Sequence, residues 1–168
     1  MTQFWDWALS AYARPGVAPA CLDLQDDHGQ CTPYLLWAAW AAKSGRGLDQ
    51  GTLAKGADLA RRWEPTFITP VRAVRRALKP AFITPVRAVR RALKPAFDGV
   101  ADDLREALRE QVKAVELAAE KTLMQSLEAL ALGAPSGSVT VQQALEQATA
   151  LWTPSAPKNS LMGLSQHL

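Results

Sequence analysis

Hydrophobic residues recur every three or four positions along most of the chain, a spacing typical of amphipathic helices that predicts an all-α fold. In the first half, helices are predicted over residues 3–13, 18–27, 33–43 and 49–63, with Thr32 as the N-cap of the third. Their short connections favour antiparallel neighbours. Five of the six tryptophans lie in this half, where large side chains at helical spacing indicate a core. The pattern therefore predicts a Trp-rich helical bundle.

The second half is dominated by one long amphipathic segment. Residues 98–132 are rich in Ala, Leu, Glu, Lys and Arg and as one helix would be about 50 Å long at 1.5 Å per residue. A hydrophobic stripe of that length needs a partner, either the bundle or another chain. A last amphipathic helix is predicted within residues 138–152, followed by a flexible tail over 153–168. The predicted stripe consists of Leu104, Leu108, Val112, Val115, Ala119, Leu123, Leu127 and Leu130.

A tandem repeat separates the two halves, because residues 67–81 recur without change as residues 82–96. Such identity indicates a recent in-frame duplication or a cloning artefact, since old repeats drift and solenoid repeats are longer. In each copy a Thr-Pro pair, at Thr69 and Thr84, is placed as N-cap and first helical residue, and a later Pro opposes continuation. Two short helices with basic faces are therefore predicted. These candidate interaction faces consist of Arg72, Arg75, Arg76 and Lys79, and of Arg87, Arg90, Arg91 and Lys94.

Positive charge is concentrated at this repeat. The net charge is +3, but residues 61–97 alone carry ten basic and one acidic residue. Eight cations on two helices can bind phosphates in a salt-dependent way, so nucleic-acid binding is one hypothesis. Under the other, these arginines face the acidic side chains of residues 98–110 in the same molecule or stay solvated. We favour the second hypothesis, since no helix-turn-helix, zinc-finger or RNA-binding motif accompanies the repeat. Binding to an anionic membrane surface is a weaker alternative, because only phenylalanines that flank the two helices could anchor them.

Length and hydropathy predict a soluble, cytoplasmic protein. With 168 residues, 48% of them hydrophobic, the chain suffices for one modest core, and we expect a single helical domain over residues 1–132. The longest hydrophobic run, residues 34–42, is about half of the ~18 residues that a membrane span requires. The first residues lack the cationic start and the cleavage site of a secretory signal.

Few residues are of types that carry catalysis or bind metals. Cys21, His28 and Cys31, with two aspartates between them, are spaced as in no standard zinc site, and the segment that ends in Gly29 also resembles a helix C-terminus. The chain has no Gly-rich phosphate loop, no Gly-x-Ser-x-Gly and no His-x-x-x-His motif. We therefore expect no enzyme activity, no cofactor and no metal.

The first third contains a more specific motif. It reads Phe4-Trp5-x-Trp7-Ala8-Leu9, then Tyr12-Ala13-Arg14-Pro15-Gly16-Val17, then Cys21-Leu22-x-Leu24-Gln25-Asp26-x-His28-Gly29. Together with segments 68–79 and 116–120, the motif resembles a family of small bacterial proteins known as a domain of unknown function. The resemblance covers most of residues 4–130, implies an all-α cytoplasmic protein and supplies no catalytic residue. The family pattern has one copy of the basic segment, whereas this chain has two.

These observations favour a non-enzymatic helical protein-interaction or scaffold module. We expect it to bind a protein partner, or to self-associate, through the predicted 98–132 helix. The alternative is a nucleic-acid-associated protein that uses the basic faces of the two repeat copies.

Overall fold

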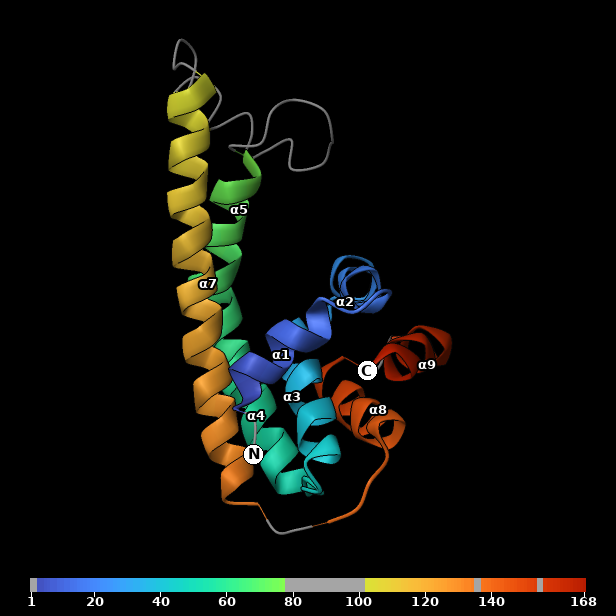
Figure 1. Cartoon of the computed structure of the whole chain (residues 1–168). Helices are drawn as coiled ribbons and strands as arrows, with labels where there is room; N and C mark the ends of the chain where they lie inside the picture. The colour runs from blue at the N-terminus through green and yellow to red at the C-terminus, as the bar shows by residue number, and fades with distance from the viewer. Residues whose placement is uncertain (1–2, 78–101, 135–136, 154–155) are drawn as a thin grey trace. The chain divides into compact units, whose positions relative to one another are not determined.

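The structure, a computed structural model, describes residues 3–77, 102–134, 137–153 and 156–168 (Figure 1). Within these ranges the backbone forms helices and no strand, so the predicted all-α class is confirmed. The chain divides into two compact units. The first comprises Met1–Arg62 and Lys121–Leu168, and the second comprises Trp63–Glu120. These units differ from the single domain predicted over residues 1–132, because the first unit includes the C-terminal helices.

The first unit is built around one buried helix. The helices that lie wholly in this unit are α1 (Phe4–Tyr12), α2 (Val17–Asp26), α3 (Thr32–Lys43), α8 (Val141–Trp152) and α9 (Lys158–His167). Two more helices belong to it in part: α4 (Gln50–Trp63) as far as Arg62, and α7 (Asp102–Leu132) from Lys121 onward. Helix α3 is hydrophobic on all sides and packs against α1, α2 and α8 (Figure 1). Every residue from Pro33 to Ala41 is buried, as expected for a helix at the centre of a bundle.

Aromatic side chains fill this core. Phe4 of α1 and Trp40 of α3 are both buried, and their ring centroids are 5.4 Å apart. Helix α4 approaches α3 closely because Gly56 has no side chain, and a Cβ there would lie 2.5 Å from the ring of Trp37. The Tyr34 hydroxyl donates to the carbonyl of Leu53 over 3.0 Å and adds a second link between the two helices.

The C-terminal part of α7 completes the first unit. Leu123 and Leu127 are buried, as the predicted stripe requires. The backbone N–H of Phe4 donates to Oε1 of Glu128 over 3.1 Å, and the Lys121 ammonium lies 5.6 Å from the ring centre of Trp5. Both contacts join α7 to α1.

Helix α9 corrects one prediction, since residues 158–167 were assigned to a flexible tail. Leu161, Leu164 and Leu168 are buried at the spacing of one helical face. The helix packs against α2 and α8. A Cβ at Gly16, which has φ of +89°, would lie 2.6 Å from the ring of His167. A short stripe of three leucines in a polar segment thus forms a helix because other helices cover it.

The N-termini of α8 and α3 are capped in different ways. Helix α8 begins as predicted within residues 138–152, and Thr140 and Gln143 form a capping box at its N-terminus. Thr32, in contrast, is not the N-cap of α3, because it is the first helical residue and Cys31 precedes it as N-cap. The Thr32 hydroxyl lies 3.5 Å from the carbonyl oxygen of Cys21 instead.

The second unit contains the π-helix η1 (Glu64–Ile68), α5 (Thr69–Ala77) and α7 up to Glu120. Thr69 was predicted to be an N-cap, but its φ of −59° and ψ of −47° are helical. Its N–H donates to the carbonyl of Glu64, which is the i→i+5 bond of a π-helix. The first repeat copy therefore enters α5 from a preceding helix rather than starting one. Residues 82–96, with the predicted N-cap Thr84, lie outside the described residues.

The predicted stripe of α7 is only partly covered. In the second unit Leu108 is 39% exposed and Val115 is 57% exposed. Val112 and Ala119 are half-buried, and the Leu104 side chain lies outside the described residues. Among the side chains that the structure describes on this part of α7, the buried one belongs to a charged residue, Glu116.

Candidate functional site

The structure describes only part of the predicted basic faces. Arg72 and Arg75 lie on α5, and Arg76 is in the same helix although its side chain is not described. The remaining five predicted residues lie outside the described residues, namely Lys79, Arg87, Arg90, Arg91 and Lys94.

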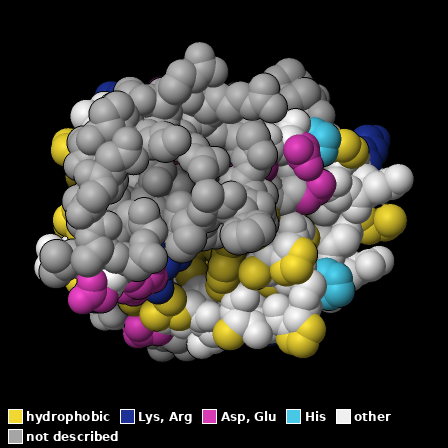
Figure 2. Space-filling model, turned by 90° about the horizontal axis from the view of Figure 1, so that it is seen from above, with side chains coloured by type: hydrophobic (Ala, Val, Ile, Leu, Met, Phe, Trp, Pro, Cys, Tyr) yellow, Lys and Arg dark blue, Asp and Glu magenta, His cyan; other side chains and the backbone are white. Residues whose placement is uncertain are grey.

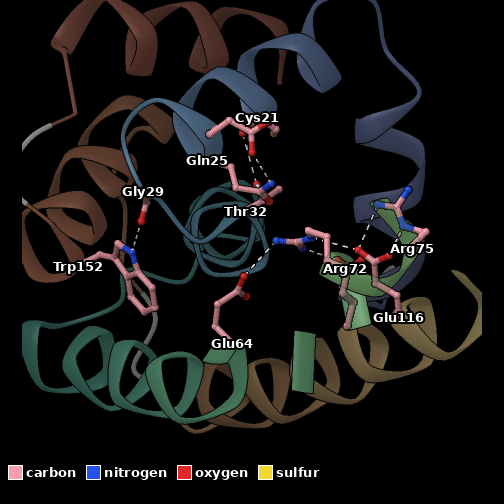
Figure 3. A network of polar contacts seen from close by, with 11 residues as sticks. Cys21, Gln25, Gly29, Thr32, Glu64, Arg72, Arg75, Glu116 and Trp152 are labelled. Atoms are coloured by element: carbon pink, nitrogen blue, oxygen red, sulfur yellow. Dashed lines mark hydrogen bonds and ion pairs between the residues drawn. The ribbon is translucent and has the colours of Figure 1, made fainter. Parts of the chain in front are cut away.

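Arg72 is surrounded by carboxylates (Figure 3). Its Nη1 lies 3.1 Å from Oε1 of Glu64, its Nε lies 3.0 Å from Oε1 of Glu116, and its Nη2 lies 2.9 Å from Oε1 of Glu120. Each guanidinium nitrogen thus has an acidic partner, an arrangement that the fork of donors in Arg allows and Lys cannot reproduce. The Arg72 side chain is 12% exposed, so water screens these pairs weakly.

Glu116 joins Arg72 to a second arginine. Arg75 donates from Nε to Oε2 of Glu116, and its Nη2 lies 3.3 Å from Oε1 of the same carboxylate. Both carboxylate oxygens therefore accept charge-assisted hydrogen bonds, which are the stronger class. The side chain of Glu116 is 6% exposed. We call Glu64, Arg72, Arg75, Glu116 and Glu120 the Arg72 cluster.

Helical spacing explains why these five side chains meet. Arg72 and Arg75 are three residues apart on α5, and Glu116 and Glu120 are four apart on α7, so each pair shares a helix face. Glu64 precedes Arg72 by eight residues, which in a regular α-helix would separate them by about 80° around the axis. The π-helix η1 lies between them and changes this phase. Its effect is to let Glu64 reach the same guanidinium as the two glutamates of α7.

Three carboxylates face two guanidiniums in the Arg72 cluster, which leaves one formal negative charge. Burial raises the pKa of Glu120, Arg72 lowers it, and the neighbouring Glu116 and Glu64 raise it, so that the pKa lies above its usual value. Burial lowers the pKa of Arg72, but its three carboxylate partners outweigh burial and the pKa is raised. Arg72 is therefore charged at any physiological pH, and the charged form of Glu120 is less favoured than that of a free glutamate side chain.

The partners of Arg72 and Arg75 differ from those predicted. Residues 98–110 were expected to supply them, but Glu106 pairs with Arg109, and Glu110 lies 3.2 Å from Lys113 on the same helix. The sequence analysis did not identify Glu116 and Glu120 as these partners. The signal that could have identified them is their position on the same helix face as the buried leucines of α7. They precede the buried leucines of α7 by seven residues each and so continue the core stripe of that helix.

The residues with metal-ligand character are not assembled into a site. Cys21 and Cys31 are buried, and burial raises the pKa of the Cys21 thiol to about 12, which disfavours the thiolate that metals bind. Asp27 is exposed and His28 is half-buried. Among the described residues, no three His, Cys, Asp or Glu side chains are placed to hold a metal ion.

The glycine after His28 has a structural role. Helix α2 ends at Asp26, and Gly29 has φ of +61°, as the predicted helix C-terminus requires. Its carbonyl accepts a hydrogen bond from Nε1 of Trp152 over 2.9 Å (Figure 3). The guanidinium of Arg61 lies 5.1 Å from the same Trp152 ring.

None of the helices that the structure describes combines the length and hydrophobicity needed to span a membrane.

The family model described as "Protein of unknown function (DUF2390)" matches the chain over residues 3–82 and again over 80–127. The first match contains the first repeat copy, and the second match contains the second copy. No curated protein and no solved structure matches the chain.

Proposed function

Since the chain belongs to the DUF2390 family of proteins of unknown function, we propose its role from the structure: a non-enzymatic helical protein-interaction module. The observation that carries this proposal is the uncovered part of the stripe on α7. Leu108 and Val115 are 39% and 57% exposed, although the same stripe is buried at Leu123 and Leu127. Exposed side chains of this kind in register along one helix mark interaction surfaces.

The spacing of the uncovered part suits a helical partner. Leu108, Val112, Val115 and Ala119 follow one another at steps of four, three and four residues, which is the a/d spacing of a coiled coil. Charged side chains beside this spacing are paired along α7, Arg109 with Glu106 and Lys113 with Glu110. The partner that fits is an amphipathic helix, supplied by a second copy of the chain or by another protein.

Sedimentation and capture from a native lysate test this proposal. Val115→Glu places a charge in the stripe and is expected to abolish association. Leu117→Glu is the matched control, because Leu117 is 43% exposed on the same helix but points away from Val115. A wild-type chain that is strictly monomeric and captures nothing would refute the proposal, and so would equal effects of the two variants.

The nucleic-acid alternative is weakened by the Arg72 cluster. To bind phosphate, Arg72 and Arg75 would have to leave carboxylates that already hold them. Figure 2 colours the described Lys and Arg side chains dark blue, whereas five of the eight predicted cations lie outside the described residues, which are grey. We expect no binding of labelled DNA or RNA at ~150 mM salt, where phosphate contacts alone give weak affinity. Binding that Arg72→Ala and Arg75→Ala abolish would favour the alternative.

A further inference from the structure

The carboxylates of the Arg72 cluster lie outside the tandem repeat, whereas its arginines lie within it. The carboxylates belong to Glu64, Glu116 and Glu120, and each of them occurs once in the chain. The arginines belong to the first repeat copy, and the same residues recur in the second copy as Arg87 and Arg90. The sequence therefore contains one set of acceptors and two sets of donors that are identical to each other.

We propose that Glu64, Glu116 and Glu120 form a binding site for an Arg-x-x-Arg segment, and that residues 82–96 compete with residues 67–81 for this site. The site recognises two guanidiniums three residues apart on one helix face, as the contacts of Arg72 and Arg75 show. Every residue around Arg87 and Arg90 within the repeat is the same as around the first pair. Contacts that depend on the repeat alone are thus equally available to both copies.

The flanking sequence gives each copy a different advantage. Glu64 lies eight residues before Arg72, whereas Lys79 stands eight residues before Arg87, so the contact to Glu64 favours the first copy. The connection to α7 favours the second copy. From Ala77 it spans 24 residues to Asp102, whereas from the equivalent Ala92 it spans nine.

Connections between packed helices are usually two to eight residues long, so the nine-residue connection is the more ordinary one. When the second copy is bound in place of the first, the fifteen residues of the unbound copy lie before the bound copy in the chain instead of after it. Loop-closure entropy depends only weakly on length, so this relocation changes the balance little. The family matches agree with this equivalence, because each copy is matched as family sequence.

Deleting one copy cannot test whether the copies compete, because removing either copy yields the same sequence. Exchanging the charges of a carboxylate and an arginine can test it. Glu116→Lys is expected to lower the Tm by roughly 10 °C, since it leaves buried charges without partners. Arg75→Glu and Arg90→Glu are then added separately. If the copies compete for the site, each second change recovers about half of the lost Tm, because either copy can present a carboxylate to Lys at position 116.

Arg62→Glu in the Glu116→Lys background is the control, since it gives the same net charge from an exposed position outside the repeat. It is expected to recover nothing. Recovery by Arg75→Glu alone would overturn the proposal, as would recovery by neither change or equal recovery by the control.

A second comparison serves if Glu116→Lys does not fold. Arg72→Glu with Arg75→Glu, and Arg87→Glu with Arg90→Glu, are each expected to keep the Tm within a few degrees of wild type, whereas the four changes together lower it further than either pair. If the first pair alone is as damaging as all four changes, the second copy does not replace the first, and the proposal is wrong.

Discussion

Arg72 donates through Nε to Oε1 of Glu116 over 3.0 Å, and Glu116 is buried on α7, seven residues before the buried Leu123. The pair is almost fully buried, so removing one partner leaves an uncompensated charge inside the protein. Such a pair adds little net stability compared with a well-packed hydrophobic pair, but it requires a specific partner. The basic segment of the repeat is therefore attached to α7 by recognition of charge.

Glu116→Ala is expected to lower the free energy of unfolding by about 3 kcal/mol, because it leaves Arg75 without its carboxylate and removes one partner of Arg72. Urea unfolding measures this loss. Glu110→Ala is the matched control on the same helix, since the Glu110 side chain is 53% exposed and its pair with Lys113 is worth at most about 1 kcal/mol. Equal losses in the two variants would show that the cluster is not buried as described.

The raised pKa of Glu120 has a consequence for stability against pH. Between the unfolded and the folded pKa of this group, the folded state binds more protons than the unfolded state. The contribution of Glu120 to stability is therefore lost as the pH rises through this window and regained as the pH falls toward its ordinary value of 4.5. Glu120→Gln is expected to flatten this dependence in urea unfolding above pH 4.5. An unchanged slope would contradict the assignment.

Gly56→Ala is expected to destabilise the protein by about 1–3 kcal/mol, although alanine is the better helix former. The reason is steric, since the new Cβ would lie 2.5 Å from the Trp37 ring. Gly51→Ala in the same helix is the control, because its nearest neighbour, Asp49 Oδ1, is 3.6 Å away. Gly51→Ala should raise the free energy of unfolding by up to about 1 kcal/mol. If both variants are stabilised, α4 does not approach α3 so closely.

Leu164→Ala is expected to cost about 2–5 kcal/mol, because Leu164 is fully buried in α9. Met162→Ala, two residues earlier and 48% exposed, should change the free energy of unfolding by less than about 0.5 kcal/mol. Thermal or urea unfolding distinguishes the two. A negligible effect of Leu164→Ala would return residues 158–167 to the flexible tail that the sequence pattern predicts.

Local signals in the sequence were enough to predict most helices. Helices α1, α2, α3 and α8 begin and end within one or two residues of the predicted bounds, or lie inside them. Their signal is the recurrence of hydrophobic residues, which acts within a few residues along each helix. The resemblance to a domain of unknown function, based on the motif that begins at Phe4, also agrees with the family match.

Tertiary structure decided what depends on distant partners. Leu161 and Leu164 of α9, with Leu168 directly after it, form a buried face because other helices cover them, and their short stripe alone does not specify that cover. Pro70 led to a predicted helix start at Thr69, whereas the π-helix η1 accommodates the preceding chain without a break. The carboxylate that holds Arg72 and Arg75 lies more than forty residues away. Periodicity places Glu116 on the core stripe of α7, but only packing shows that two arginines, rather than water or another chain, neutralise it.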